Sequence, residues 1–183
     1  MKRTDLLRAL CSDERNINAR TLEQVVCLAA EIAREGAGGH KVGTMLVVAD
    51  SDEVLKRSTN LILDPLGCYP DQHKRLDDAN LRGTVKELAQ LDGAFVVSND
   101  GIVLSACRYI NASSEGISLP LGLGSRHMAA ASITRQTRAI AIVASESAIV
   151  RVFDAGRIVA EIIPELWLLN YLDSALMSDY VRP

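Results

Sequence analysis

Apolar residues follow two patterns along the chain: helical spacing and continuous runs. Leu22, Val25 and Ala29 lie three and four residues apart, which predicts a helix that opens with the capping box Thr21-Leu-Glu-Gln24 and ends at Gly36. Continuous apolar runs, such as Met45-Leu-Val-Val48, predict strands that are buried on both faces. Further helices are expected at 80–90, capped by Asn80, and from the glycine-rich segment near 122 to about 137. Strands are expected at 42–49, 94–98, 102–109, 139–144, 150–153 and 157–160.

Turn signals separate these elements. Asn99-Asp-Gly101 and Asp154-Ala-Gly156 each predict a β-hairpin. A loop with a short helix is expected at 50–58, and irregular structure at 61–79, where prolines and a glycine interrupt regular elements.

The sum is an α/β fold with a mixed central β-sheet flanked by helices in a single layered domain. We expect this domain at 21–165. A helical N-terminal extension at 1–20 precedes it, and a helical segment at 166–183 packs on it.

Composition narrows the function classes. The chain has 183 residues and a net charge of −3, which leaves no basic surface for nucleic acid, so no nucleic-acid partner is expected. The four cysteines are scattered without a CxxC pair, which argues against zinc and for reduced thiols. The N-terminus is not a signal peptide and no stretch is long enough for a membrane span. We therefore expect a cytoplasmic protein with no membrane association.

The segment Leu121-Gly-Leu-Gly-Ser-Arg-His-Met128 holds the strongest chemical signal. Its glycines allow a tight turn, and the helix expected after it would point unpaired N–H groups and a positive dipole end at an anion. Arg126 can grip phosphate oxygens, and Ser125 and His127 add donors. The segment therefore predicts a phosphate site.

Two carboxylates lie at strand edges. Asp92 and Gly93 enter an expected strand, and Glu146 follows the apolar strand that ends at Ala144. Taken alone, the first is typical of a helix-to-strand turn and the second of a solvated strand end. Together with the phosphate site, they provide the groups that a site for a divalent metal and a nucleotide needs. Tyr69 or Tyr109 could stack on a purine, although packing is the more common role of such residues.

These segments resemble one family. Asp92-Gly-Ala94 is similar to the Asp-Gly-Ala motif of the diadenylate cyclase domain of the DisA N-terminal type. Gly124-Ser-Arg-His127 is similar to its Gly-Thr/Ser-Arg-His-Arg motif. Lys41-Val-Gly-Thr-Met-Leu-Val-Val48 and Val143-Ala-Ser-Glu146 are similar to the surrounding family sequence, and the resemblance spans about residues 20–162.

The resemblance implies an enzyme, a nucleotidyltransferase that condenses two ATP into cyclic di-AMP and two pyrophosphates where two protomers meet face to face. It implies Mg or Mn as a divalent metal cofactor, ATP as substrate and a homo-oligomer as the active form. The implied catalytic residues are Asp92, Gly93 and Ala94, the implied ATP-binding residues are Gly122, Gly124, Ser125, Arg126 and His127, and the implied metal ligands are Asp92 and Glu146.

The sequence departs from the family at Met128, which stands where the motif has its second arginine. Methionine cannot hold a phosphate, so Arg108 or Arg151 would have to supply that charge if the fold brings one of them close. The alternative function is a nucleotide-binding or sensor module of the same fold with weakened catalysis. The two carboxylates favour the enzyme, because a protein that only binds has less need of groups that position a metal.

Overall fold

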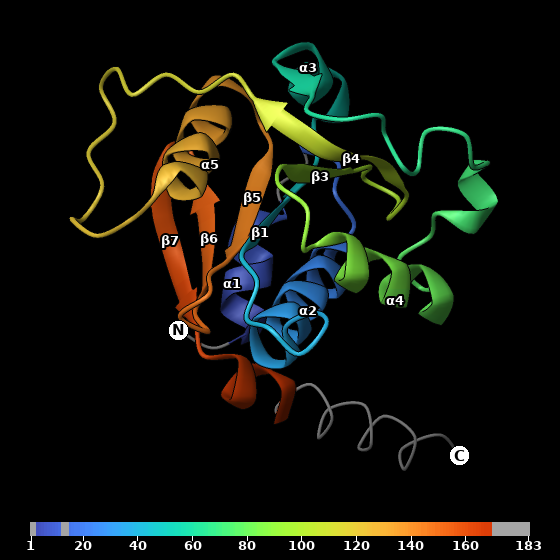
Figure 1. The fold of residues 1–183 in the computed structure, drawn as a ribbon. Coiled ribbons are helices and arrows are strands. Elements are labelled where there is room, and N and C mark those ends of the chain that lie inside the picture. Colours follow the sequence, from blue (N-terminus) through green and yellow to red (C-terminus); the bar gives the residue numbers. More distant parts are fainter. Residues whose placement is uncertain (1–2, 12–14, 170–183) are drawn as a thin grey trace.

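The centre of the protein is a seven-stranded sheet with the order β2-β4-β3-β1-β5-β6-β7, seen in a computed structural model that describes residues 3–11 and 15–169 (Figure 1). β1 runs parallel to β3, and the other neighbouring strands are antiparallel. The expected mixed sheet is thus confirmed. The strands are β1 (Thr44–Val48), β2 (Ser58–Asn60), β3 (Ala94–Val97), β4 (Val103–Ile110), β5 (Ile140–Ala144), β6 (Val150–Asp154) and β7 (Arg157–Ile162).

Helices cover both faces of the sheet (Figure 1). Leu46 and Val48 of β1 join the core that also holds the buried side of α2, whereas Met45 and Val47 join the core of α5. This alternation explains the continuous apolar run of β1, because each face of the strand meets a helix layer. The helices are α1 (Arg3–Leu10), α2 (Ala19–Glu35), α3 (Ser51–Lys56), α4 (Ala79–Leu88), α5 (Ser125–Gln136) and a 3-10 turn at Asp71–His73, and residues 164–169 are also helical.

Two helices begin earlier than predicted. Asn18 caps α2 by accepting a hydrogen bond from the N–H of Arg20, and Asp78 caps α4 by accepting from the N–H of Asn80. Both capping residues have extended backbones, which brings their short side chains in front of the first turn. Thr21 and Asn80 therefore lie inside the first turns and cap nothing. Gly36 ends α2 as predicted.

β2 was not predicted. The segment Ser58–Asn60 is polar and begins at the last residue of the loop expected at 50–58, yet it forms an antiparallel edge with residues 108–110 of β4. Its strand character comes from backbone pairing with a neighbour far along the chain, which no local apolar pattern announces.

The C-terminal half of α5 is tied to two loops. Arg135 Nη1 donates to the carbonyl of Glu115 across 2.6 Å, and the N–H of Gly156 donates to Thr134 Oγ1 across 3.2 Å. These bonds fix the helix against the segment that leads into it and against the β6–β7 turn. No helix within 3–11 and 15–169 has the length and apolar character that a membrane crossing requires. The predicted C-terminal helical segment lies largely outside the described residues.

Candidate functional site

The N-terminus of α5 is open to a ligand. Gly124 precedes the helix, and no side chain caps this end, in contrast to α2 and α4. Gly124 has an extended backbone, and a Cβ placed there would meet nothing within 4 Å. Neither backbone strain nor packing therefore demands glycine at this position. Its effect is to leave the first N–H groups of the helix uncovered, which is the arrangement of an anion site.

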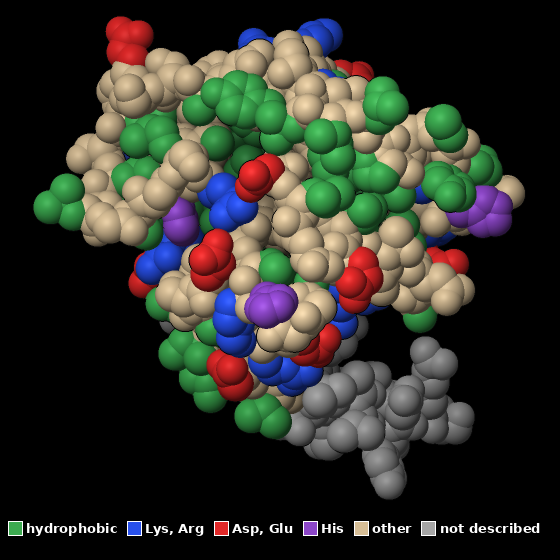
Figure 2. Space-filling model, in the orientation of Figure 1, with side chains coloured by type: hydrophobic (Ala, Val, Ile, Leu, Met, Phe, Trp, Pro, Cys, Tyr) green, Lys and Arg blue, Asp and Glu red, His purple; other side chains and the backbone are tan. Residues whose placement is uncertain are grey.

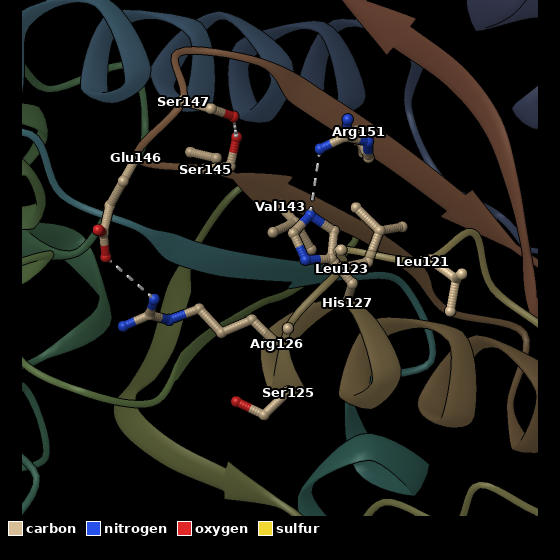
Figure 3. A pocket seen from close by; sticks show the side chains of 13 residues that line it. Leu121, Leu123, Ser125, Arg126, His127, Val143, Ser145, Glu146, Ser147 and Arg151 are labelled. Atoms are coloured by element: carbon tan, nitrogen blue, oxygen red, sulfur yellow. Dashed lines mark hydrogen bonds and ion pairs between the residues drawn. The ribbon is translucent and has the colours of Figure 1, made fainter.

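A hollow lies in front of this helix end; we call it the α5 hollow (Figure 3). Its volume is about 440 Å³, within the usual range for small-ligand sites. Gly122 lines it with a φ of +90°, a conformation that favours glycine. The lining residues are 121–127, 143–147 and Arg151.

A second hollow adjoins the first; we call it the Asp92 hollow. Its volume is about 510 Å³, and its walls combine Asp92 and Arg108 with apolar side chains that include Leu61 and Tyr109. Ser125 and Arg126 line both hollows. The two hollows are therefore neighbours, with Ser125 and Arg126 between them.

Arg126 connects the two predicted carboxylates. Its Nη2 lies 3.0 Å from Asp92 Oδ1, and its Nη1 lies 3.8 Å from Glu146 Oε1. Figure 3 shows the Arg126 side chain extended toward Glu146 at the end of β5. The guanidinium also lies against Gly43, where an added Cβ would come within 2.7 Å of Nη1. The fold thus brings together four segments that are far apart in the sequence.

Gly93 is required by the neighbouring strand. Its φ is +107°, and a Cβ there would lie 2.6 Å from the carbonyl carbon of Cys107. The register between β3 and β4 shifts at this point, and Cys107 itself has a φ of +53°. This β-bulge brings the two backbones together, so packing alone accounts for the glycine. Gly93 also borders the Asp92 hollow.

Ala94 does not line the site surface, and its expected place beside the nucleotide stays a prediction. Its side chain is fully buried in the core beneath α5, and it lines neither hollow. As the first residue of β3 it pairs with Met45 on one side and Arg108 on the other. Both partners line the Asp92 hollow, so the Ala94 methyl lies on the same face of the sheet as that hollow, beneath its wall.

His127 lies beneath the α5 hollow and is 8% exposed. Burial, together with the positive charges of Arg151 and Arg126, lowers the pKa of His127 below its usual value near 6.5. The ring is therefore neutral at pH 7. Its Nε2 lies 3.4 Å from Nη1 of Arg151, and because arginine can only donate, we place the ring proton on Nδ1. Nδ1 is buried and has no hydrogen-bond partner among the described residues.

The two arginines considered as substitutes for the family's second arginine lie in different places. Arg151, on β6, lines the α5 hollow together with Arg126 and His127. Arg108, on β4, lines the Asp92 hollow, and its guanidinium donates to the carbonyl oxygens of Leu55 and Ser58 and to the side chains of Ser58 and Asn60. Met128 lines neither hollow.

The donor set suits a hard divalent cation. Asp92 and Glu146 are both largely exposed, and both reach the same guanidinium, so carboxylate oxygens already converge on one positive charge. Within the described part of the chain, no cluster of three or more His, Cys, Asp and Glu side chains could hold a metal ion by itself. Magnesium is commonly held by one or two carboxylates together with water and substrate phosphates. The two carboxylates fit that pattern.

Sequence reasoning missed several residues of the site. Gly43 was quoted only as part of a strand, yet it makes the space that the Arg126 guanidinium fills. Leu61 follows β2, which was not predicted, and reaches the wall of the Asp92 hollow. Arg151, a lone cation between the apolar residues of a strand, was expected only as a candidate substitute for the family's second arginine, and it lines the α5 hollow.

The chain is similar to known proteins over most of its length. Residues 31–158 match the model of the family described as "DisA bacterial checkpoint controller nucleotide-binding". The chain is 44% identical over 153 residues to a diadenylate cyclase of Methanocaldococcus jannaschii, a match that covers 83% of this chain and 48% of the relative. It is 40% identical over 147 residues to a diadenylate cyclase of Haloferax volcanii, covering 80% and 54%. The chain thus spans about half the length of these curated relatives.

Solved structures agree on the fold. A crystal structure of a double mutant of DacA from Staphylococcus aureus superposes with a TM-score of 0.56 at 18% identity, covering 81% of this chain and 90% of that one. A protein from Bacillus cereus, described as a hypothetical membrane spanning protein, gives 0.55 at 17% identity, covering 75% and 61%. With the matched family model and the identities to two curated relatives, these findings confirm the resemblance read from the motifs: the chain belongs to the diadenylate cyclase domain family, the nucleotide-binding family of DisA.

Proposed function

We propose that this chain condenses two molecules of ATP into cyclic di-AMP and releases two molecules of pyrophosphate. The observation that carries the proposal is the position of Arg126, which lies between a hollow at the uncapped N-terminus of α5 and a hollow that contains Asp92. Two relatives named diadenylate cyclase, at 40–44% identity, support the reaction class.

The triphosphate belongs in the α5 hollow. The uncovered N–H groups of α5 and the Arg126 guanidinium face that space, and both stabilise negative charge. Ser125 adds a hydroxyl donor at the boundary of the two hollows. In the reaction the same groups neutralise the charge that builds up on the departing pyrophosphate.

The nucleoside belongs in the Asp92 hollow. Leu61, Tyr109 and Ile110 give it an apolar wall on which a purine can rest, and Asp92 offers a carboxylate to the ribose. The 3′-hydroxyl of one ATP attacks the α-phosphorus of the other, which forms an O3′–P bond and breaks the bond to the β-phosphate oxygen. The hydroxyl proton is accepted by Asp92 or water and passes to solvent, and the second, symmetric attack closes the ring.

Asp92 and Glu146 would hold a magnesium or manganese ion. When bound, such an ion supplies positive charge that lowers the pKa of the attacking hydroxyl and offsets phosphate charge. An ion held there would take the place of the Arg126 guanidinium beside the two carboxylates, and Arg126 would keep its contact with the phosphates.

One protomer supplies half of the reacting pair. Both hollows open to the surface, and the side chains of Leu61, Tyr109 and Leu121, which line them, are exposed. Figure 2 shows hydrophobic side chains spread over the face of the molecule on the side of β4. A second protomer placed face to face would cover these groups and set the two nucleotides against each other.

The test is to incubate the purified chain with ATP and either magnesium or manganese, and to identify the products by mass spectrometry. Cyclic di-AMP with pyrophosphate is the expected result, at a rate per protomer that rises with protein concentration because two protomers must meet. Binding of ATP without any product would overturn the proposal in favour of a sensor module. A different adenylated product would assign the chain to another class of nucleotidyltransferase.

A further inference from the structure

Arg151 is a second cation in the α5 hollow, held in place from behind. It lies on β6, opposite Glu161 of β7 in the antiparallel ladder, and its Nε lies 2.7 Å from Glu161 Oε1. Nη1 is turned to the other side, 3.4 Å from Nε2 of His127 (Figure 3). The Arg151 side chain is 13% exposed, so its direction is fixed by the strand and by two neighbours.

The charge of the α5 hollow depends on this residue. The charged side chains that line it are Arg126, Arg151 and Glu146, which sum to +1; Glu161, which pairs with Arg151 from behind, does not line the hollow. Without Arg151 the sum would be zero, because His127 is neutral at pH 7. A polyanion would then meet only the helix end and an arginine already paired with two carboxylates.

The other candidate is committed elsewhere. The Arg108 guanidinium is surrounded by acceptors from α3 and β2, with Nη2 at 2.7 Å from the carbonyl of Ser58 and 3.1 Å from that of Leu55. These bonds join β4 to the neighbouring edge of the sheet. Arg108 therefore has a structural task, and it lines only the Asp92 hollow.

We propose that Arg151 binds the terminal phosphates of the nucleotide, and so supplies in this chain the charge that Met128 does not. This inference rests on the proposed function in that it takes ATP as the ligand. Asp92 borders only one hollow and Arg151 only the other, while Arg126 borders both. The order Asp92, Arg126, Arg151 then follows the nucleotide from its ribose through the α-phosphate to the phosphate terminus.

The first experiment compares the affinities of ATP, ADP and AMP for the wild type, R151Q and R157Q by calorimetry. Arg157 is the matched control, an exposed arginine on the neighbouring strand β7 that lines neither hollow. We expect R151Q to weaken ATP binding at least about tenfold, since hydrogen bonds between charged groups are the strong ones, and to leave AMP binding unchanged. R157Q should match the wild type for all three ligands.

A rescue variant separates binding from structural support. In R151Q/M128R an arginine returns at the family's position, and we expect ATP affinity to recover in part while AMP affinity stays constant. If R151Q does not fold, as judged by its thermal transition, R151K takes its place. Lysine keeps the charge without the planar fork, so we expect R151K to lose part of its ATP affinity while its AMP affinity stays unchanged. Equal ATP affinity in R151Q and R157Q, or an equal loss for ATP and AMP in R151Q or R151K, would overturn the inference.

Activity distinguishes this inference from the function on which it rests. If the wild type makes cyclic di-AMP and R151Q binds ATP as well as R157Q does, Arg151 has been misassigned and the reaction stands. If the wild type makes no cyclic di-AMP and R151Q still loses ATP selectively, the phosphate contact stands and the cyclase proposal fails.

Discussion

Gly43 and Arg126 occupy the same small space: a Cβ on Gly43 would lie 2.7 Å from Nη1 of the Arg126 side chain. The obstacle is the far end of a flexible side chain, and the Gly43 backbone does not have the positive φ that favours glycine. An alanine there would displace the guanidinium and leave the strand intact. Gly43 thus sets the position of a charge that belongs to another element.

We predict that G43A lowers ATP affinity and cyclic di-AMP formation while its free energy of unfolding changes by less than about 1 kcal/mol. The matched control is G83A on the exposed side of α4, where a Cβ meets nothing within 4 Å. That change should stabilise the protein by about 0.5–1 kcal/mol and leave ATP binding alone, because alanine is the better helix former. Thermal unfolding and calorimetry measure both, and normal ATP binding in G43A would contradict the role of Gly43.

Two glycine substitutions separate the effect of backbone strain on stability from that of a steric clash. At Gly93 a Cβ would meet the β4 backbone at 2.6 Å with a φ of +107°, whereas at Gly122 the φ is +90° and nothing lies within 4 Å. We predict that G93A costs at least about 2 kcal/mol of stability and G122A only about 1 kcal/mol. Denaturant unfolding gives both values. Equal losses of stability in the two variants would show that the backbone of the β-bulge at Cys107 can shift to make room for the Cβ.

The stability of the protein should fall as the pH drops below about 6.5. Burial, Arg151 and Arg126 lower the pKa of His127 in the folded state, so between the folded and unfolded pKa values the unfolded chain binds more protons. The stabilisation by neutral His127 is therefore complete above the unfolded pKa and is lost as the pH falls toward the folded one. H127Q should lack this part of the pH dependence in denaturant titrations, and an unchanged profile would disprove it.

D92N should abolish cyclisation and spare the fold. The Asp92 side chain is 86% exposed, so its ion pair with Arg126 contributes little to stability, within about 0.5 kcal/mol. We expect cyclic di-AMP formation to fall at least about a hundredfold while ATP still binds. D100N is the matched control, since Asp100 is an exposed aspartate that also precedes a glycine, in the hairpin turn at the other end of β3. Retained turnover in D92N would remove Asp92 from the reaction.

Sequence patterns predicted the elements that are defined locally. The apolar run around Leu46, the hairpin at Asn99-Asp-Gly101 and the helix after Gly124 all appear in the structure. β2 could not be predicted, because Ser58–Asn60 is polar and becomes a strand only through its pairing with β4. The helix starts were missed because Asn18 and Asp78 are as good caps as the residues chosen, and only the backbone geometry decides between them.

The same distinction holds for the site. The motifs predicted Asp92, Arg126 and Glu146 as site residues, each from its own short segment of sequence. That one guanidinium lies between the two carboxylates depends on how β3, α5 and β5 meet, which no segment encodes alone. Likewise, the choice between Arg108 and Arg151 required the fold, because both are single arginines in apolar strands and only their neighbours differ.

The bonds that tie the C-terminal half of α5 have a consequence at its other end. Arg135 and Thr134 hold the helix to the Glu115 carbonyl and to the β6–β7 turn, roughly two turns away from the hollow. Because the helix is anchored outside the site, the N–H groups at its N-terminus have a fixed direction before any ligand binds. The entropic cost of orienting these N–H groups is therefore incurred on folding and does not reduce the affinity for a phosphate.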